Sequence, residues 1–328
     1  MKRILIYWFL GGVSLCHGAC SSENRPKGEP GKPGEPEVST TRIFFGDPFI
    51  MLHDGTYYAY GTASADGIEV YTSADLTVWQ PAPGRRLALD RKDVWADKWF
   101  WAPEVYHVNG KFYMYYSADE HICVATGDSP LGPFRQAEQK PMIAGEKCID
   151  NSLFIDDDGK PYLFFDLFND GLNIWVAEME NNLLDIKKET MQKCISVSQE
   201  WEEVWPRVNE GAFVVKHNGT YYMTYSANSY ESPFYGIGVA TATHVKGPWT
   251  KYDKNPVYQK AGDLVGTGHS AMFTDKDGKL RIVFHSHHSR TEIHPRIMHI
   301  STVSFGQEDG REIMKIDPKY ITPVLEIK

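Results

Sequence analysis

A chain of 328 residues is long enough for one large core or for two small domains. Its 34 Lys and Arg residues stand against 43 Asp and Glu residues, and no long basic run stands out. This charge balance gives no electrostatic support to nucleic-acid binding, so we expect no nucleic-acid partner. Aromatic residues make up 13% of the chain, which favours a β-rich core.

The first 19 residues are typical of an export signal of the lipoprotein type. Lys2 and Arg3 precede an apolar run over residues 4–15, and small residues stand directly before Cys20. We expect cleavage before Cys20 and its lipidation, with ordinary secretion without a lipid as the alternative. On this interpretation the protein is exported to the periplasm or is an outer-membrane-anchored lipoprotein of a bacterium. It then touches the membrane only through the lipid anchor.

Residues 20–40 are rich in Pro, Gly and Glu and show no apolar periodicity. Such a segment cannot bury enough apolar surface to fold, so we predict a disordered linker. The folded domain is expected over residues 41–328.

One pattern occurs five times between residues 46 and 286: an apolar run, an Asp-Gly or Asn-Gly turn and a second run of β-forming residues. The turn glycines are Gly55, Gly110, Gly159, Gly219 and Gly278. In the fourth copy, Asn218-Gly219 suits the positive φ angles of a two-residue hairpin turn. A further strand-like run follows each hairpin, so each repeat offers three or four antiparallel strands.

Repeats of about fifty residues, none able to bury both faces of its own sheet, favour radial packing around an axis. We therefore predict an all-β, five-bladed β-propeller. A row of β-sandwich modules is the alternative, but the repeats follow one another without linkers. Residues 311–328 carry strand-like runs, which we expect to close the ring or to pack beneath it.

The first strand of each repeat would lie innermost, so its opening residues converge at one end of the axis. Nine residues before the turn glycines stand Gly46, Trp101, Asp150, Glu210 and His269. Asp47 follows Gly46 directly, and Glu104 lies three residues after Trp101. Acids at single strand ends often only bind water or cap turns. Their recurrence beside apolar residues favours a site, because unpaired buried charge is costly.

Four segments carry a resemblance to a known family. They are Gly46-Asp47-Pro48, the run IDNSLF from Ile149, Asn209-Glu210-Gly211-Ala212, and Gly268-His269-Ser270. Together, over roughly Thr41 to Phe305, the chain resembles glycoside hydrolase family 43. The resemblance implies inverting enzymes on five-bladed propellers that act on arabinose- and xylose-containing glycans.

Residue roles follow from the same resemblance. It implies Asp47 as general base, Glu210 as general acid and Asp150 as the carboxylate that tunes and orients the acid. It also implies His269 beside an axial water or a structural calcium ion, with no cofactor required. A general acid must hold its proton near neutral pH, so the pKa of Glu210 should be raised by burial and by the like charge of Asp150. Asp47 must stay ionised, about 6.5–9.5 Å from Glu210.

Further residues are expected to contact substrate. These are Phe49, Trp101 and Arg296, with blade packing as the alternative for Trp101 and Arg290 as the alternative arginine. Glu104 is interpreted as structural. Two inserts, residues 90–100 and 196–207, hold tryptophans that either line the cleft rim or pack a loop onto the propeller. A metal site at His285, His287 and His288 is disfavoured, because alternation along a strand points neighbouring side chains to opposite faces.

The predicted function is that of an exported glycoside hydrolase that cleaves terminal pentose residues of plant polysaccharides with inversion. An α-L-arabinofuranosidase is the first choice, and a β-xylosidase or endo-1,4-β-xylanase is the alternative. An exo-β-galactosidase and a non-catalytic sugar-binding propeller are less favoured. A configuration-retaining relative is disfavoured because the acid segment reads Asn209-Glu210-Gly211 and not Arg-Asp-Pro. We expect a monomer whose partner is an arabinose- or xylose-containing oligosaccharide or polysaccharide.

Overall fold

The computed structural model describes residues 38–204 and 206–327. The predicted signal peptide, Cys20 and residues 20–37 of the predicted linker lie outside the described residues. Within the described part, no helix is long and apolar enough to cross a membrane.

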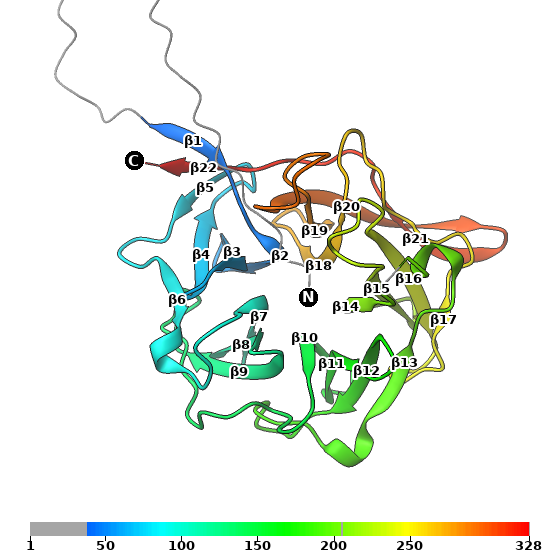
Figure 1. The fold of residues 1–328 in the computed structure, drawn as a ribbon, viewed down its shortest axis with the longest axis horizontal. Coiled ribbons are helices and arrows are strands. Elements are labelled where there is room, and N and C mark those ends of the chain that lie inside the picture. The colour runs from blue at the N-terminus through cyan, green and yellow to red at the C-terminus, as the bar shows by residue number, and fades with distance from the viewer. Residues whose placement is uncertain (1–37, 205, 328) are drawn as a thin grey trace, which may run out of the picture. The chain divides into compact units, whose positions relative to one another are not determined.

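The strands form five sheets arranged around a central axis (Figure 1). Three sheets have four strands, one has three and one has seven. The first strand of each repeat, β2, β7, β10, β14 or β18, lies nearest the axis in Figure 1. The all-β propeller arrangement expected from the repeats is confirmed.

The first sheet holds β1 (Ser39–Arg42), β2 (Gly46–His53), β3 (Thr56–Ser64), β4 (Gly67–Ser73), β5 (Val78–Pro81), β6 (Leu87–Asp90) and β22 (Val324–Ile327). The second holds β7 (Trp101–Val108), β8 (Lys111–Ala118) and β9 (His121–Gly127), and the third β10 (Cys148–Ile155), β11 (Pro161–Phe168), β12 (Leu172–Glu178) and β13 (Gln192–Ile195). The fourth holds β14 (Asn209–His217), β15 (Thr220–Ala227), β16 (Gly236–Ala242) and β17 (Thr250–Lys251), and the fifth β18 (Gly268–Thr274), β19 (Leu280–Ser286), β20 (Ile297–Glu308) and β21 (Arg311–Ile316). Short 3₁₀ turns are η1 (Arg91–Asp93), η2 (Lys188–Thr190) and η3 (Glu200–Glu202).

The hairpin turns are of two lengths. In the first, second and fourth sheets the strands are joined by Asp54-Gly55, Asn109-Gly110 and Asn218-Gly219, with positive φ at both residues. This is the two-residue turn expected for these dipeptides. In the third and fifth sheets the strands are separated by residues 156–160 and 275–279, and the glycine alone has positive φ.

Every innermost strand contains a β-bulge at its start. The register shifts between Gly46 and Phe49, Trp101 and Glu104, Ile149 and Ser152, Glu210 and Phe213, and Gly268 and Ala271. The first bulged residues are Asp47, Ala102, Asp150, Gly211 and His269, with φ between 44° and 61°. Counting back from the turn glycine therefore does not select equivalent positions, because the turns differ in length. Glu210 stands one residue before the bulge, whereas Asp47, Asp150 and His269 are bulge residues.

The bulges link neighbouring sheets into a closed ring. Each bulge N–H donates to a side chain on the second strand of the preceding sheet: Ala102 to Thr62, Asp150 to Ser117, Gly211 to Asp166, His269 to Ser226 and Asp47 to His285, at 2.7–3.1 Å. Three acceptors are hydroxyls, one is a carboxylate and one is an imidazole. A bulge removes one residue from the strand pairing, and these bonds satisfy the N–H groups that it frees.

The two ends of the described chain meet in the first sheet. β22 pairs with β1 on one side and with β5 on the other, and β21 completes the fifth sheet (Figure 1). Of the segment 311–328, the described residues 311–327 thus help to close the ring, which was one of the two expectations. The expected linker boundary at residue 40 is corrected, because Ser39 and Thr40 pair with Ile327 and Glu326. The β1 sequence STTR has no apolar residues that would indicate a strand. Only its pairing with β22 identifies it as one.

Candidate active site

A cavity of about 380 Å³ lies at the end of the axis where the bulges converge. Its lining residues are Asp47, Thr62, Trp101, Ile149, Asp150, Phe168, Leu172, Pro206, Val208, Glu210, Ser229, Tyr230, His269, His294 and Arg296. The three predicted catalytic carboxylates, the predicted histidine and two of the three predicted substrate contacts therefore share one pocket. Its volume suits one or two sugar units, at the small end of the roughly 300–1,000 Å³ usual for ligand sites.

Asp47 is held by an unusually complete set of donors. Arg296 donates from Nη1 to Oδ1 at 2.6 Å and from Nη2 to Oδ2 at 2.9 Å, and Thr62 donates to Oδ2 at 2.6 Å. A carboxylate offers about four lone-pair positions, so one remains on Oδ1. Gly46 makes this pair possible, because a Cβ there would lie 2.1 Å from the Arg296 guanidinium carbon.

These contacts keep Asp47 ionised. Burial is the largest single effect and raises the pKa of Asp47, but the charge and hydrogen bonds of Arg296, together with the neighbouring His269 and His285, outweigh burial and hold the pKa well below its ordinary range. His285 accepts the Asp47 N–H through Nδ1 at 3.1 Å and is fully buried. Burial, together with the charge of Arg296, lowers the pKa of His285 well below its ordinary value, so this imidazole is a neutral acceptor.

Glu210, unlike Asp47, lies in an environment that favours its protonated form. Tyr235, itself fully buried, donates to Oε1 at 2.6 Å, which leaves Oε2 for a proton. Burial raises the pKa of Glu210 to about 7, with the charge of Asp47 adding to the effect and the Tyr235 hydrogen bond opposing it. The expected elevation is thus present, but the like charge that acts on Glu210 belongs to Asp47. Gly268 is needed beside this pair, because a Cβ there would lie 2.1 Å from the Tyr235 ring.

Asp150 forms a pair with a fourth carboxyl group, Asp166, which sequence reasoning missed. Asp166 is fully buried on β11 and accepts the Gly211 N–H at Oδ2, and its carboxyl group lies beside that of Asp150. Burial raises the pKa of Asp150 well above its ordinary value, and the charges of Glu210 and Asp47 raise it further. Burial and the neighbouring Asp150 raise the pKa of Asp166 likewise. Two carboxyl groups this close hold at least one proton between them near neutral pH, and the charge of Glu210 is among the causes that raise the pKa of Asp150.

His269 stands between the two predicted carboxylates. Its Nδ1 lies 3.4 Å from Asp47 Oδ1 and 3.9 Å from Asp150 Oδ2. Burial lowers the pKa of His269, so the imidazole is neutral at pH 7. Gly211 gives it space, because a Cβ there would lie 3.1 Å from the ring.

Two of the three predicted substrate contacts line the pocket, and the third does not. Trp101 lines the pocket and packs against Ile149, Leu172 and Val208, and Arg296 lines it while paired with Asp47. The alternative arginine, Arg290, pairs with Asp263 on the surface. The prediction that Phe49 contacts substrate is wrong, because its side chain is 5% exposed and does not line the pocket. The bulge at Asp47 resets the strand alternation, so Phe49 packs on the rings of Tyr106 and Phe213.

Glu104 lies outside the pocket lining. Tyr106 donates a hydrogen bond to its carboxylate, and burial raises the pKa of Glu104 to about 8. Its surroundings match the structural interpretation, since no second acid or arginine of the pocket is hydrogen-bonded to it within the described residues.

The two inserts pack differently. In the first, Trp95 packs on the His121 ring, whereas Trp99 is 46% exposed and stacks on Trp101. In the second, Glu202 is fully buried and paired with Lys251, whose ammonium also donates to Asn209 at 2.8 Å. This insert therefore braces the residue before Glu210.

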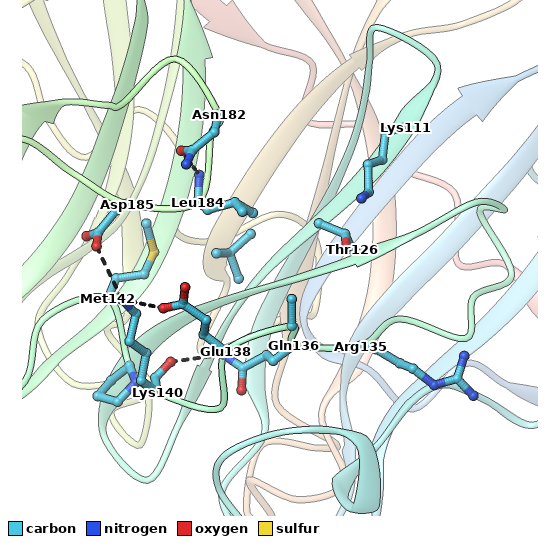
Figure 2. A pocket seen from close by; sticks show the side chains of 13 residues that line it. Lys111, Thr126, Arg135, Gln136, Glu138, Lys140, Met142, Asn182, Leu184 and Asp185 are labelled. Atoms are coloured by element: carbon cyan, nitrogen blue, oxygen red, sulfur yellow. Dashed lines mark hydrogen bonds and ion pairs between the residues drawn. The ribbon is translucent and has the colours of Figure 1, made fainter.

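Another pocket lies away from the axis, between β9 and the loop after β12 (Figure 2). Figure 2 shows Lys140 reaching toward Glu138 and Asp185. The Lys140 ammonium lies 2.8 Å from the Glu138 carboxylate and 3.9 Å from that of Asp185. Arg135 pairs with Asp93. The charges of these residues largely neutralise one another, and none of the predicted site residues lines this pocket.

Comparisons with known proteins identify the family of this chain. The model of the family described as "Glycosyl hydrolases family 43" matches residues 40–310. A solved structure titled endo-1,4-β-xylanase from Bacteroides thetaiotaomicron is 45% identical with a TM-score of 0.83, covering 89% of this chain and all of that one. A β-D-galactofuranosidase of Aspergillus niger is 26% identical over 81% of this chain and 78% of its own length. An extracellular exo-α-(1→5)-L-arabinofuranosidase of Streptomyces avermitilis is 26% identical over 77% of this chain, which spans only 57% of that relative.

Proposed function

This chain belongs to glycosyl hydrolases family 43 and is a glycoside hydrolase, and we propose that it removes terminal pentose units from plant polysaccharide side chains with inversion of configuration. The favoured activity is that of an α-L-arabinofuranosidase. The observation that carries the proposal is the contrast between two carboxyl groups of one pocket. Asp47 is locked in its ionised form by Arg296, while the pKa of Glu210 is raised to about 7.

The contrast supports different roles for the two groups, with Glu210 as general acid and Asp47 as general base. Glu210 keeps its proton below about pH 7 and donates it from Oε2 to the glycosidic oxygen as the bond to the sugar breaks. Asp47 accepts a proton from the attacking water through the lone-pair position left on Oδ1. A base this weak suits a transition state with oxocarbenium character, in which the water forms its bond late. We place that water between the two groups, which requires a separation of about 6.5–9.5 Å.

Asp150 takes a positioning role in this proposal. Its N–H bond to Ser117 and its link to Asp166 fix a protonated or shared carboxyl group beside the sugar position. Such a group donates a hydrogen bond to a substrate hydroxyl or to Glu210 without adding a full negative charge.

A calcium ion beside His269 would have to be held through water. Within the described residues, no group of three or more His, Cys, Asp or Glu side chains is arranged to hold a metal ion. The two carboxylates nearest His269 are engaged, Asp47 with Arg296 and Asp150 with Asp166. Direct coordination does not fit these residues, and the hydrolytic steps need only Asp47, Glu210 and water.

A second candidate activity is cleavage of β-1,4-xylan, because the solved structure that is 45% identical carries that title. The experiment that separates the two is a panel of aryl arabinosides, xylosides and galactosides with arabinan and xylan oligosaccharides, run on wild type and Glu210→Gln. We expect release of arabinose by the wild type and at least a hundredfold loss in the variant on the oligosaccharides. NMR of the first product should show inverted configuration. Retained configuration would exclude the mechanism, and activity on xylosides alone would select the second candidate.

A further inference from the structure

Two large apolar side chains remain exposed at the mouth of the active-site pocket. Trp99 is 46% exposed and Phe168 is 47% exposed. Phe168, the last residue of β11, lines the pocket directly. Trp99 stacks on Trp101, a lining residue, with ring centroids 5.7 Å apart and planes inclined by 14°. Exposed aromatic surface continuous with a pocket is a feature of ligand grooves.

The position of Trp99 is costly to maintain. Its φ is 58°, in the left-handed region that bulky residues avoid, and such strain costs about 1–3 kcal/mol. Lys98, whose ammonium lies 4.2 Å from the Trp99 ring centroid, is itself paired with Asp119 at 3.0 Å. The backbone and the lysine thus fix the ring at the pocket mouth, although burial gains little there.

The two sides of the mouth differ in chemistry. Trp99, Trp101 and Phe168 form an aromatic rim, and Trp101 packs against the apolar Ile149 cluster. Arg296 and Tyr230 lie on the polar side, with the guanidinium carbon 4.9 Å from the Tyr230 ring centroid. A sugar ring carries an apolar C–H face and polar hydroxyl edges, so it matches a mouth of this kind.

We propose that the aromatic rim of Trp99, Trp101 and Phe168 is a carbohydrate subsite for the part of the glycan that leaves after cleavage. The inference rests on the proposed function and deepens it: the preferred substrate is an oligosaccharide with at least two further sugar units beyond the scissile bond. Lys98 supplies a donor to hydroxyl groups of those units. Binding energy from units remote from the reacting bond raises the rate on long substrates relative to truncated ones.

The test compares arabinotetraose and xylotetraose with the matching aryl pentosides. In Trp99→Ala and Phe168→Ala, the ratio of kcat/KM on the tetrasaccharide to kcat/KM on the aryl pentoside should fall about tenfold. Phe234→Ala is the matched control: Phe234 is 49% exposed under the ammonium of Lys260 but does not line the pocket, so the ratio should not change. Equal losses on both substrates would show that Trp99 only supports Trp101, and unchanged kcat/KM values on both substrates would show that the rim binds nothing. Either result overturns the proposal.

A binding measurement keeps this test separate from the proposed function. Calorimetric titration of the Glu210→Gln variant with the same tetrasaccharides should give affinities about tenfold weaker when Trp99→Ala is added. If the wild type hydrolyses none of the substrates, the proposed function fails, and the titration still decides the rim. Tetrasaccharide affinity that is unaffected by both rim substitutions contradicts the subsite.

Discussion

The backbone N–H of Gly211 donates to Oδ2 of Asp166 at 2.8 Å, and Gly211 directly follows Glu210 in the chain. The corresponding bond in three other sheets ends on a hydroxyl, at Thr62, Ser117 and Ser226. Asp166 therefore performs the common structural task and adds a carboxyl group beside Asp150. The Asp166 side chain thus couples the position of Glu210, the proposed acid, to the protonation of Asp150.

Replacing Asp166 separates these two tasks. Asp166→Ala leaves the buried Gly211 N–H without an acceptor, which costs about 1–3 kcal/mol of stability and lets the start of β14, which carries Glu210, shift. We expect kcat to fall at least tenfold while KM changes little. Asp166→Asn keeps a carbonyl acceptor and should retain kcat within about threefold. Steady-state kinetics and thermal unfolding of both variants check this, and an Asn variant as impaired as the Ala variant would show that the carboxyl proton itself is required.

Tyr235 sets the upper pH limit of activity. Its hydroxyl stabilises the ionised form of Glu210, so the pKa of about 7 is lower than burial alone would produce. In Tyr235→Phe the ring still fills the space beside Gly268, but the pKa of Glu210 should rise. The alkaline limb of kcat/KM, expected near pH 7 in the wild type, should therefore move to higher pH. A limb that stays in place or moves to lower pH would contradict the assignment of Glu210 as the acid.

Arg296 keeps Asp47 ionised and compensates its buried charge. Removing one partner of a buried ion pair costs about 3–5 kcal/mol, so Arg296→Met should lower the free energy of unfolding by that order. Because the pKa of Asp47 is depressed in the folded protein, its stabilisation is present above the unfolded pKa of about 3.9 and is lost as pH falls. The difference in stability from the wild type should therefore be larger at pH 7 than at pH 3.

Arg296→Lys is the matched control for this substitution. It keeps a positive charge but cannot bind both carboxylate oxygens in the fork geometry. Its loss of stability should lie between those of wild type and Arg296→Met, and its acid limb of kcat/KM should move to higher pH. Urea titrations at the two pH values, with pH–rate profiles, provide the measurement. Equal stability losses at pH 3 and pH 7 would show that the ion pair does not control the titration of Asp47.

The repeats and the shared pocket could be predicted because their signals are local. Asp-Gly and Asn-Gly turns between β-forming runs specify hairpins, and equivalent strands in a ring bring their starts together. The exact alignment of those starts could not be predicted. Gly159 and Gly278 sit in five-residue loops, whereas Gly219 sits in a two-residue turn, so a fixed count from the glycine misaligns Glu210 by one position.

The partners of the carboxylates depend on contacts distant in the chain. Tyr235 reaches Glu210 from the loop between β15 and β16, and His285 supports Asp47 from the opposite end of the sequence. One signal was available for Asp166: a lone acid in the apolar run LFFD is costly unless it is paired. Phe49 was misassigned because a bulge, which no local pattern announces, changes the face on which the following residues lie.

Glu104 offers a test of the carboxyl group that the mechanism leaves out. Its pKa is raised by burial to about 8, so the folded protein retains a proton that the unfolded chain releases above about pH 4.3. Stability due to this group is thus fully present below about pH 4.3 and is lost as pH rises toward 8. Glu104→Gln keeps an acceptor for the Tyr106 hydroxyl but cannot ionise. Its melting temperature, compared with that of the wild type, should improve progressively from pH 5 to pH 8.

Activity supplies the second half of this prediction. Because Glu104 does not line the pocket, Glu104→Gln should retain most of the wild-type kcat/KM, whereas Glu210→Gln should lose at least a hundredfold on oligosaccharides. Thermal scans at three pH values and assays of both variants make the comparison. Loss of activity in Glu104→Gln comparable to that in Glu210→Gln would transfer the acid's role to Glu104, whose raised pKa would then have a catalytic purpose.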